Sequence, residues 1–433
     1  MVVLLLILIF GTLPLLPSFH FGTDAMYQCH DGVIHAVRLL HLERAFWQGN
    51  FAPTWIPTLA GGAGSAVFLF NWFVPYYLAL LFKLFGTTYV DSIKLVILFA
   101  HIFSGVTMYL LGTRLTNKNG GLVASAFYLL SPHRLNIIFT RCAVGEVVGQ
   151  ALLPLVIYLT LDKTKFRHAV LFLGILALSH NVTFIFATAL ILLINWRVAV
   201  FGALVSAFFW LPAMIEQKYL QFNNLVSYRF RDQFVPFMAL LNSPWQYGPP
   251  IPENQSLSMS FQLGKLHWIF TIIAGVVFYK TRNKFLGLTI LIFIFSILVA
   301  LPISRWFWEN IPLLWVAVFP WRFQLVSAPG MAVLAGFVGW HFKINKIFVV
   351  LILALLVLFN RNHFWAPLGD YAGKAYLETI KTDGGSWGEF LPKNYDNFPG
   401  LVKVGQGYSY EETPIRKIAK IFSGIGIIGL WLF

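Results

Sequence analysis

The segment VVLLLILIFGTLPLLP (residues 2–17), followed by HDGVIHAVR (residues 30–38), decides the fold class of this chain. The first segment is apolar. The second gathers two imidazoles, a carboxylate and a guanidinium in a chain that is 58% hydrophobic and 11% charged. If the second segment is helical, Asp31, His35 and Arg38 fall at i, i+4 and i+7, on one face. Such a group at the mouth of a membrane helix is more typical of a reaction site than of an anchor.

Repeated apolar segments predict a polytopic membrane protein rather than a water-soluble globule. The mean hydropathy is +0.72, and a spanning helix needs about 20 mostly apolar residues. We therefore predict an all-α bundle of about 11–13 transmembrane helices, with two passes in segment 169–195. The candidate spans are 2–17, 93–112, 120–131, 148–161, 169–195, 198–215, 266–279, 285–301, 322–340, 347–359 and 418–433.

The net charge of +14 comes largely from basic residues in short connectors between apolar segments, where Asp162 is the single acid. This is the positive-inside pattern, which sets orientation in a membrane. We therefore predict no nucleic-acid partner, a plasma (inner) membrane location and an outward-facing Asp31 cluster. The connector residues are Arg114, Lys118, Lys163, Lys165, Arg167, Arg197, Lys280, Arg282, Lys284, Lys343 and Lys346.

This orientation holds only if segment 66–85, which contains Asn71 and Pro75, does not cross the bilayer. We expect it to lie along the membrane or re-enter it within the first outer loop. The first apolar segment has no Lys or Arg before it and no small-residue cleavage site. An uncleaved span is therefore expected rather than a signal peptide.

The outer segments long enough to form a site are 18–90, 132–147, 216–265 and 361–417. The sequence predicts three parts: a transmembrane catalytic module over 1–360, a small extracytoplasmic cap over 361–417 and a C-terminal transmembrane helix over 418–433. The cap segment is rich in glycine, charge and aromatic residues, a composition that favours a folded unit over disorder.

Asp31 is the first candidate for chemistry. A carboxylate beside His30, His35 and Arg38 can stay ionised and accept a proton from a hydroxyl group, as a general base must. The alternative is a helix N-cap or an interfacial salt bridge to Arg38. Asp24 is the rival carboxylate.

The second outer loop carries Arg134, Arg141 and Glu146. Two arginines suit a phosphate or pyrophosphate group, which they bind through charge-assisted hydrogen bonds. Glu146 opens the next span, where an acid also interacts favourably with the helix dipole. Alternatively, Asp31, His35 and Glu146 share a divalent cation, since oxygen ligands suit Mg²⁺ or Mn²⁺.

Three further positions are candidates. His180-Asn181 interrupts an apolar stretch, where polar groups usually face a cavity or a partner helix; a hydrogen-bonded helix break is the alternative. Arg322, in Pro-Trp-Arg-Phe, lies at headgroup height, where it reaches a lipid phosphate or the phosphate of a lipid substrate. Arg229 competes for that role.

The chain has two cysteines, Cys29 and Cys142, each close to a polar cluster in a predicted outer loop. Either a disulfide joins the two loops or both thiols are free.

These residues occur in short motifs that run in a fixed order along about three quarters of the chain. Through them the chain resembles the GT-C superfamily of integral-membrane glycosyltransferases. It is most similar to the bacterial and archaeal family often labelled "6-pyruvoyl-tetrahydropterin synthase-related", a label that we do not take as evidence of pterin chemistry. The motifs are Asp31-Gly-x-x-His35-x-x-Arg38, Trp55-Ile-Pro57-x-Leu59-Ala-Gly61-Gly-x-Gly64, Phe68-Leu-Phe70, Pro75-Tyr-Tyr77-Leu78, His133-Arg134, Arg141 to Glu146, Leu153-Pro154-Leu155, Ser179-His180-Asn181 and Phe319-Pro-Trp-Arg-Phe323.

The resemblance implies a GT-C-type helical bundle whose large first outer loop, with juxtamembrane helices, carries the catalytic carboxylate. It implies transfer of a sugar from a polyprenyl-phosphate carrier to an extracytoplasmic glycan, lipid or protein acceptor, generally with inversion. The chain departs from the family pattern at His133, often Tyr there, at Ala63, often Tyr within Gly-Tyr-Gly, and at Cys142, commonly Gly. These departures concern substrate preference more than the reaction class.

On this interpretation Asp31 activates the acceptor, and His35 and Arg38 hold its orientation. Arg141 and Arg322, together with Arg134, stabilise the leaving phosphate. Glu146 orients the acceptor or helps to bind a metal ion. Two other functions are open: a transporter or flippase of a lipid-linked saccharide, and a membrane O-acyltransferase that uses His180 as its catalytic imidazole.

Overall fold

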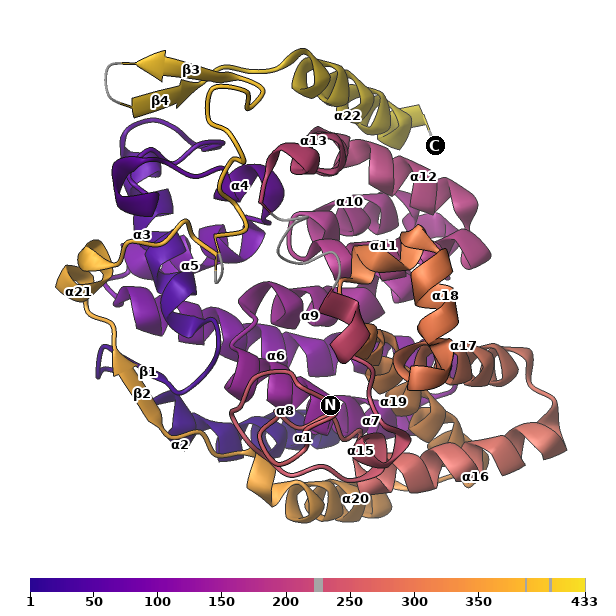
Figure 1. The fold of residues 1–433 in the computed structure, drawn as a ribbon. Helices are drawn as coiled ribbons and strands as arrows, with labels where there is room; N and C mark the ends of the chain where they lie inside the picture. Colours follow the sequence, from indigo (N-terminus) through magenta and orange to yellow (C-terminus); the bar gives the residue numbers. More distant parts are fainter. Residues whose placement is uncertain (222–228, 386–387, 405–406, 433) are drawn as a thin grey trace.

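A computed structural model describes residues 1–221, 229–385, 388–404 and 407–432, and these are mainly helical (Figure 1). The helices are α1 (Val2–Thr12), α2 (Leu16–Phe19), α3 (Gly32–Trp47), α4 (Val67–Phe70), α5 (Val74–Leu84), α6 (Tyr89–Leu115), α7 (Lys118–Leu129), α8 (Pro132–Asn136), α9 (Val144–Thr160), α10 (Phe166–Ala177), α11 (Asn181–Ile194), α12 (Trp196–Val205), α13 (Ala207–Glu216), α15 (Phe237–Leu241), α16 (Lys265–Thr281), α17 (Lys284–Ala300), α18 (Arg305–Asn310), α19 (Gln324–His341), α20 (Lys346–Phe359), α21 (Lys374–Thr379) and α22 (Pro414–Leu432). The strands are β1 (Ala25–Tyr27), β2 (Leu368–Tyr371), β3 (Leu401–Val404) and β4 (Gly407–Tyr410), and they form two small antiparallel sheets, β1–β2 and β3–β4.

Several helices are apolar enough for a membrane. Among the described residues, four stretches reach at least 18 residues with sufficient hydropathy, or six if each of two bent helix pairs counts as one span. The bends are 76° between α12 and α13 and 80° between α17 and the helices that follow it. The predicted class of a helical, polytopic membrane protein is confirmed. Fewer helices meet this length criterion than the about 11–13 passes expected, because α5, α9, α11 and α20 are apolar but shorter.

Small residues bring the central helices close together. A Cβ atom at Gly120 on α7 would lie 2.6 Å from the carbonyl oxygen of Gly336 on α19. A Cβ at Gly112 on α6 would lie 2.9 Å from the Cα of Gly121 on α7. Lipid offers little hydrophobic driving force for helix association, so close backbone approach at glycines is the expected means of packing these helices.

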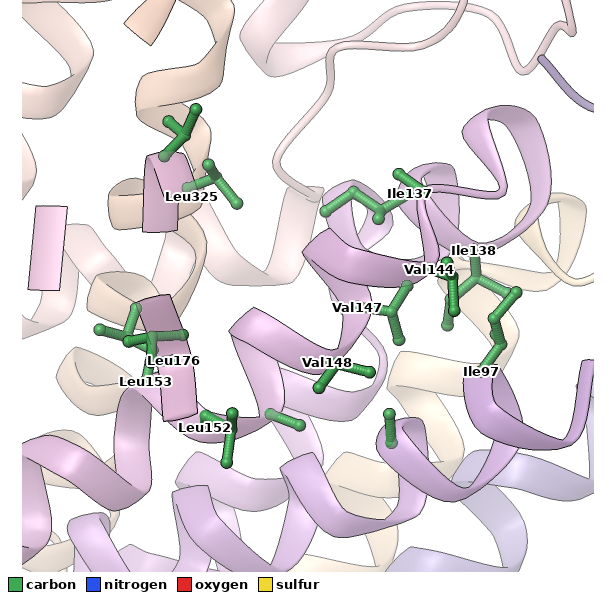
Figure 2. Packing of buried hydrophobic residues seen from close by; sticks show 14 of the residues in the cluster. Ile97, Ile137, Ile138, Val144, Val147, Val148, Leu152, Leu153, Leu176 and Leu325 are labelled. Carbon is green, nitrogen blue, oxygen red and sulfur yellow. The ribbon is translucent and has the colours of Figure 1, made fainter. Parts of the chain in front are cut away.

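Helix α9 lies in the middle of this bundle, packed against α6, α10 and α11. Figure 2 shows its buried side chains Val144, Val147, Val148, Leu152 and Leu153 among those of neighbouring elements. The packing fixes the position of the first turn of α9.

Segment 66–85 is broken rather than continuous. Helix α4 ends before Asn71, which is extended, and α5 begins at Val74. The 11 residues of α5 rise about 16 Å, too little to cross a hydrocarbon core of about 30 Å. The α5 helix packs instead against α3 and α6, as expected for a segment that does not cross.

The segment 361–417 packs against the first outer segment. Strand β2 pairs with β1, with Ala25 opposite Tyr371. Glu378 on α21 forms an ion pair of 2.5 Å with Arg44 on α3, and the Ala60 amide donates to the Thr382 carbonyl over 2.7 Å. The cap boundaries drawn from the sequence stay predictions, but this part of the chain lies directly on α3.

Helix α22 lies along α12 and α13 (Figure 1). Its Arg416 donates to the buried Glu216 carboxylate at the end of α13 over 2.6 Å, and Thr413 donates to the other oxygen over 2.8 Å. In addition, Ser423 accepts from the Phe208 amide, at the bend between α12 and α13, over 2.8 Å. These bonds fix the C-terminal helix against the bundle.

Candidate active site at four helix N-termini

Asp31 lies at the N-cap position of α3. The backbone amide of Asp31 donates to the Arg141 carbonyl over 3.2 Å, and that of His30 donates to the Thr140 carbonyl over 2.9 Å. The first and second outer segments are therefore hydrogen-bonded together at Asp31. In the described chain the Asp31 carboxylate makes no capping hydrogen bond to α3, so the N-cap alternative does not explain it.

His35 and Arg38 share a partner in Tyr76 on α5. Arg38 donates to the Tyr76 hydroxyl oxygen over 2.9 Å, and His35 Nδ1 lies 2.8 Å from the same oxygen. The Tyr76 hydroxyl can therefore donate its own proton to His35 Nδ1. The proton of the neutral His35 ring is then on Nε2, which is buried and has no hydrogen-bond partner among the described residues. Burial, with the Arg38 charge, holds the pKa of His35 well below its usual value, so the ring is neutral.

Arg38 also donates through Nε to the carbonyl of Gly384, and its guanidinium lies 5.7 Å from the Phe390 ring centroid. The α3 helix is thereby attached to the segment that follows α21. Tyr76 in turn stacks on Trp72, with ring centroids 5.2 Å apart. Trp72 packs so closely on α9 that a Cβ at Gly145 would lie 2.3 Å from its ring.

The chain between α8 and α9 turns sharply at Arg141. Residues Ile137–Arg141 form a π-helical turn, and Cys142 has φ +53°, in the left-handed region. The turn places Arg141 beside Glu146, in the first turn of α9, where a negative charge is favoured by the helix dipole. An Arg141 guanidinium N–H donates to Glu146 Oε2. Glu146 is 1% exposed, and its Oε1 has no hydrogen-bond partner among the described residues.

Arg322 approaches from the start of α19. Its Nη1 donates to the Ala317 carbonyl over 3.2 Å, while its buried Nε has no partner in the described part of the chain. The charge of Arg322 interacts with those of Arg141, Glu146 and Asp31. Between the two arginines lies the Trp321 ring, 4.7 Å from the Arg141 guanidinium carbon and 5.7 Å from that of Arg322.

His180 and His133 both interact electrostatically with Glu146. His180 is the N-cap of α11: its Nδ1 lies 2.7 Å from the Thr183 hydroxyl and accepts from the Thr183 amide over 3.3 Å. The hydrogen-bonded helix break considered for His180-Asn181 is therefore present. Asn181 itself is exposed.

The structure thus brings together Asp31, Arg141, Glu146, Arg322 and His180, at or just before the N-termini of α3, α9, α19 and α11. We call these five residues the polar cluster. The positive end of a helix dipole and two guanidinium groups favour an anion. His30 lies at its edge, with Nε2 3.0 Å from the Gly248 carbonyl oxygen, and burial lowers its pKa.

Arg134 and Asp24 are predicted residues that lie outside this cluster. Arg134 is 2% exposed and donates to Gln150 over 3.0 Å and to Ser104 over 2.7 Å, inside the helix bundle. Asp24 lies at the start of β1, where its carbonyl accepts from Ala372 and its charge interacts with Lys94. The side chain of Arg229 lies outside what the structure describes.

A divalent cation finds no set of side-chain ligands. Within the described residues, no three His, Cys, Asp or Glu side chains are grouped so as to hold a metal ion. The expected trio of Asp31, His35 and Glu146 is divided, because Glu146 pairs with Arg141 and His35 with Tyr76.

Sequence reasoning missed Tyr76, Trp72 and Trp321 as members of the site. Tyr76 and Trp321 stand within the short motifs through which the chain resembles the GT-C superfamily, but aromatic residues are common throughout this chain. Their contacts with His35, Arg38 and Arg141 depend on tertiary packing.

Comparisons with known proteins give a distant structural likeness. No family model matches the sequence, and no curated protein does. Among solved structures, the chain is similar to ArnT from Cupriavidus metallidurans, crystallised with undecaprenyl phosphate. The identity is 11%, the match covers 78% of this chain and 77% of that chain, and the TM-score is 0.40. Because this similarity is low, the proposed function is based on the residues of the polar cluster.

Proposed function

We propose that this protein is a membrane glycosyltransferase of the GT-C type. It transfers a sugar from a polyprenyl-phosphate donor to an acceptor hydroxyl on the extracytoplasmic face of the plasma (inner) membrane, with inversion. The observation that carries the proposal is that the partly buried carboxylate of Asp31 interacts with Arg322, which is also partly buried and lies beside the buried Arg141.

In the proposed reaction Asp31 accepts the proton of the acceptor hydroxyl as the oxygen bonds to the anomeric carbon of the donor sugar. The bond from that carbon to the phosphate oxygen breaks, and polyprenyl phosphate leaves. Negative charge grows on the phosphate in the transition state, so fixed guanidinium groups at that point lower the barrier. Arg322, whose Nε lacks a partner among the described residues, has a donor to offer a phosphate oxygen.

Glu146 acts through Arg141 in this proposal. Its buried carboxylate accepts from Arg141, which holds the guanidinium in place before substrate binds. Helix N-termini at the same point add backbone dipoles of the sign that an anionic phosphate requires.

An apolar groove suits the isoprenoid chain of the donor. It is lined by residues of α6, α9, α11, α17 and α19, among them Leu153, Pro154, Val326 and Pro329. Val326 follows Arg322 by four residues, so the proposed phosphate site and the groove are joined by a short stretch of chain at the start of α19. An isoprenoid tail gains free energy there by burial against apolar side chains.

The test compares two acids. We expect Asp31→Asn to abolish transfer, because the amide cannot accept the proton, while Asp24→Asn keeps activity near that of the wild type. Each variant is reconstituted in proteoliposomes with a bacterial polyprenyl-phosphate-sugar extract, and loss of sugar from the lipid is followed by mass spectrometry. Near-wild-type transfer by Asp31→Asn would remove the assignment.

The same measurement separates the alternatives. A transporter leaves the lipid-linked sugar covalently unchanged. If the protein is an acyltransferase that depends on His180, His180→Ala abolishes its activity and Asp31→Asn leaves that activity intact. We expect His180→Ala to weaken transfer without abolishing it, since the Nδ1 of this histidine caps α11.

A further inference from the structure

The two cysteines of the chain lie side by side at the point where two outer segments meet. Cys29 is two residues before Asp31, and Cys142 directly follows Arg141. Their side chains interact with each other, and both thiols are free. The sulfur atoms therefore stand between the segment that carries the proposed base and the segment that carries a proposed phosphate ligand.

The backbone holds the pair together. The amides of His30 and Asp31 donate to the carbonyls of Thr140 and Arg141, which fixes the segments on the C-terminal side of Cys29 and the N-terminal side of Cys142. The Cys29 sulfur folds over Gly32, where a Cβ would lie 2.7 Å from it. The absence of a side chain at Gly32 leaves this space to the sulfur.

The surroundings of the pair decide how it reacts. Cys142 is buried, and its thiol interacts with Tyr27, whose hydroxyl donates to the Ile138 carbonyl over 2.8 Å. Cys29 is partly exposed. Burial raises the pKa of Cys29 well above its usual value, so little thiolate is present at neutral pH and exchange is slow.

We propose that Cys29 and Cys142 form a disulfide that joins the Asp31 segment covalently to the Arg141 segment. The Cys29 thiolate attacks a small disulfide and releases one thiol, giving a mixed disulfide at Cys29. The Cys142 thiolate then attacks the Cys29 sulfur and releases the second thiol. Each cysteine loses one proton, and the small disulfide is reduced to two thiols. Disulfides persist outside the cytoplasm, where the proposed function places this site.

The experiment reads the bond itself, independently of transferase activity. The folded protein in detergent is incubated with glutathione disulfide, unfolded in the presence of N-ethylmaleimide without reductant, digested and analysed by mass spectrometry. We expect a cross-linked peptide that contains Cys29 and Cys142. The proposal is overturned if both cysteines are alkylated, or if Cys29 carries glutathione and no cross-link forms.

Matched variants give a second readout. Cys29→Ser and Cys142→Ser each remove one partner with little change in volume. We expect the midpoint of thermal unfolding of the oxidised wild type to fall when dithiothreitol is added, because the cross-link constrains the unfolded chain. The midpoints of both variants are expected to be unaffected by dithiothreitol. An equal response of wild type and variants to the reductant would contradict the proposal.

Discussion

The ion pair between Arg141 and Glu146 offers the sharpest test of the polar cluster. The Arg141 side chain is 10% exposed and the Glu146 side chain 1%. Removing one member of a buried pair leaves the other charge uncompensated and costs about 3–5 kcal/mol. We expect Glu146→Gln to lower the free energy of unfolding by about 3 kcal/mol, at the lower end of that range, because Gln still accepts one hydrogen bond from Arg141.

A double-mutant cycle isolates the pair. The variants Glu146→Gln, Arg141→Gln and the double variant are unfolded in mixed micelles with increasing sodium dodecyl sulfate, followed by tryptophan fluorescence. We expect a coupling free energy of about 2 kcal/mol, within the range for contacting residues. The matched control is Glu412 with Lys420, a pair of 2.5 Å whose side chains are 36% and 64% exposed. Exposed pairs contribute about 0–1 kcal/mol. Equal coupling in the two pairs would refute the buried arrangement.

Three further outcomes are expected. Tyr76→Phe removes the hydroxyl shared by His35 and Arg38. We expect kcat to fall about 10–100-fold, which corresponds to an activation barrier higher by about 1.4–2.7 kcal/mol, with KM for the donor little changed. A change in KM as large as that in kcat would contradict this positioning role. Arg416→Gln leaves the buried Glu216 with Thr413 alone and should cost about 3–5 kcal/mol of unfolding free energy, whereas an unchanged unfolding midpoint would show that α22 is held by packing only. Burial lowers the pKa of His363 to about 4. Below about pH 6.5 the unfolded chain therefore binds a proton at His363 that the folded chain does not. The free energy of unfolding should fall from pH 6.5 towards pH 4, and His363→Gln should flatten that slope.

Several features of the site could be predicted from the sequence. The spacing of Asp31, His35 and Arg38 predicted one helical face, and α3 begins directly after Asp31. The apolar segments predicted the helical membrane class. The distribution of basic connectors along the chain required that segment 66–85 does not cross, and α4 ends before Asn71. Each of these predictions depends on spacing, apolar composition or charge along the sequence, which can be analysed without tertiary contacts.

The features that sequence reasoning missed depend on tertiary packing. Arg134 and Arg141 looked equivalent in one short loop, but the π-helical turn between them directs Arg134 to Gln150 and Arg141 to Glu146. Tyr76 could not be distinguished from the many other aromatic residues until its contacts with α3 were known. No local pattern indicates that Gly384 accepts a hydrogen bond from Arg38.

That last contact joins residues 346 positions apart, and it has a consequence for biosynthesis. Helix α3 leaves the ribosome early, whereas β2, α21 and Gly384, which hold it in place, are among the last parts to be made. A nascent or truncated chain therefore inserts its first helices without an anchored Asp31 segment. The contacts that hold Arg38 and the start of α3 are therefore complete only when synthesis is nearly finished.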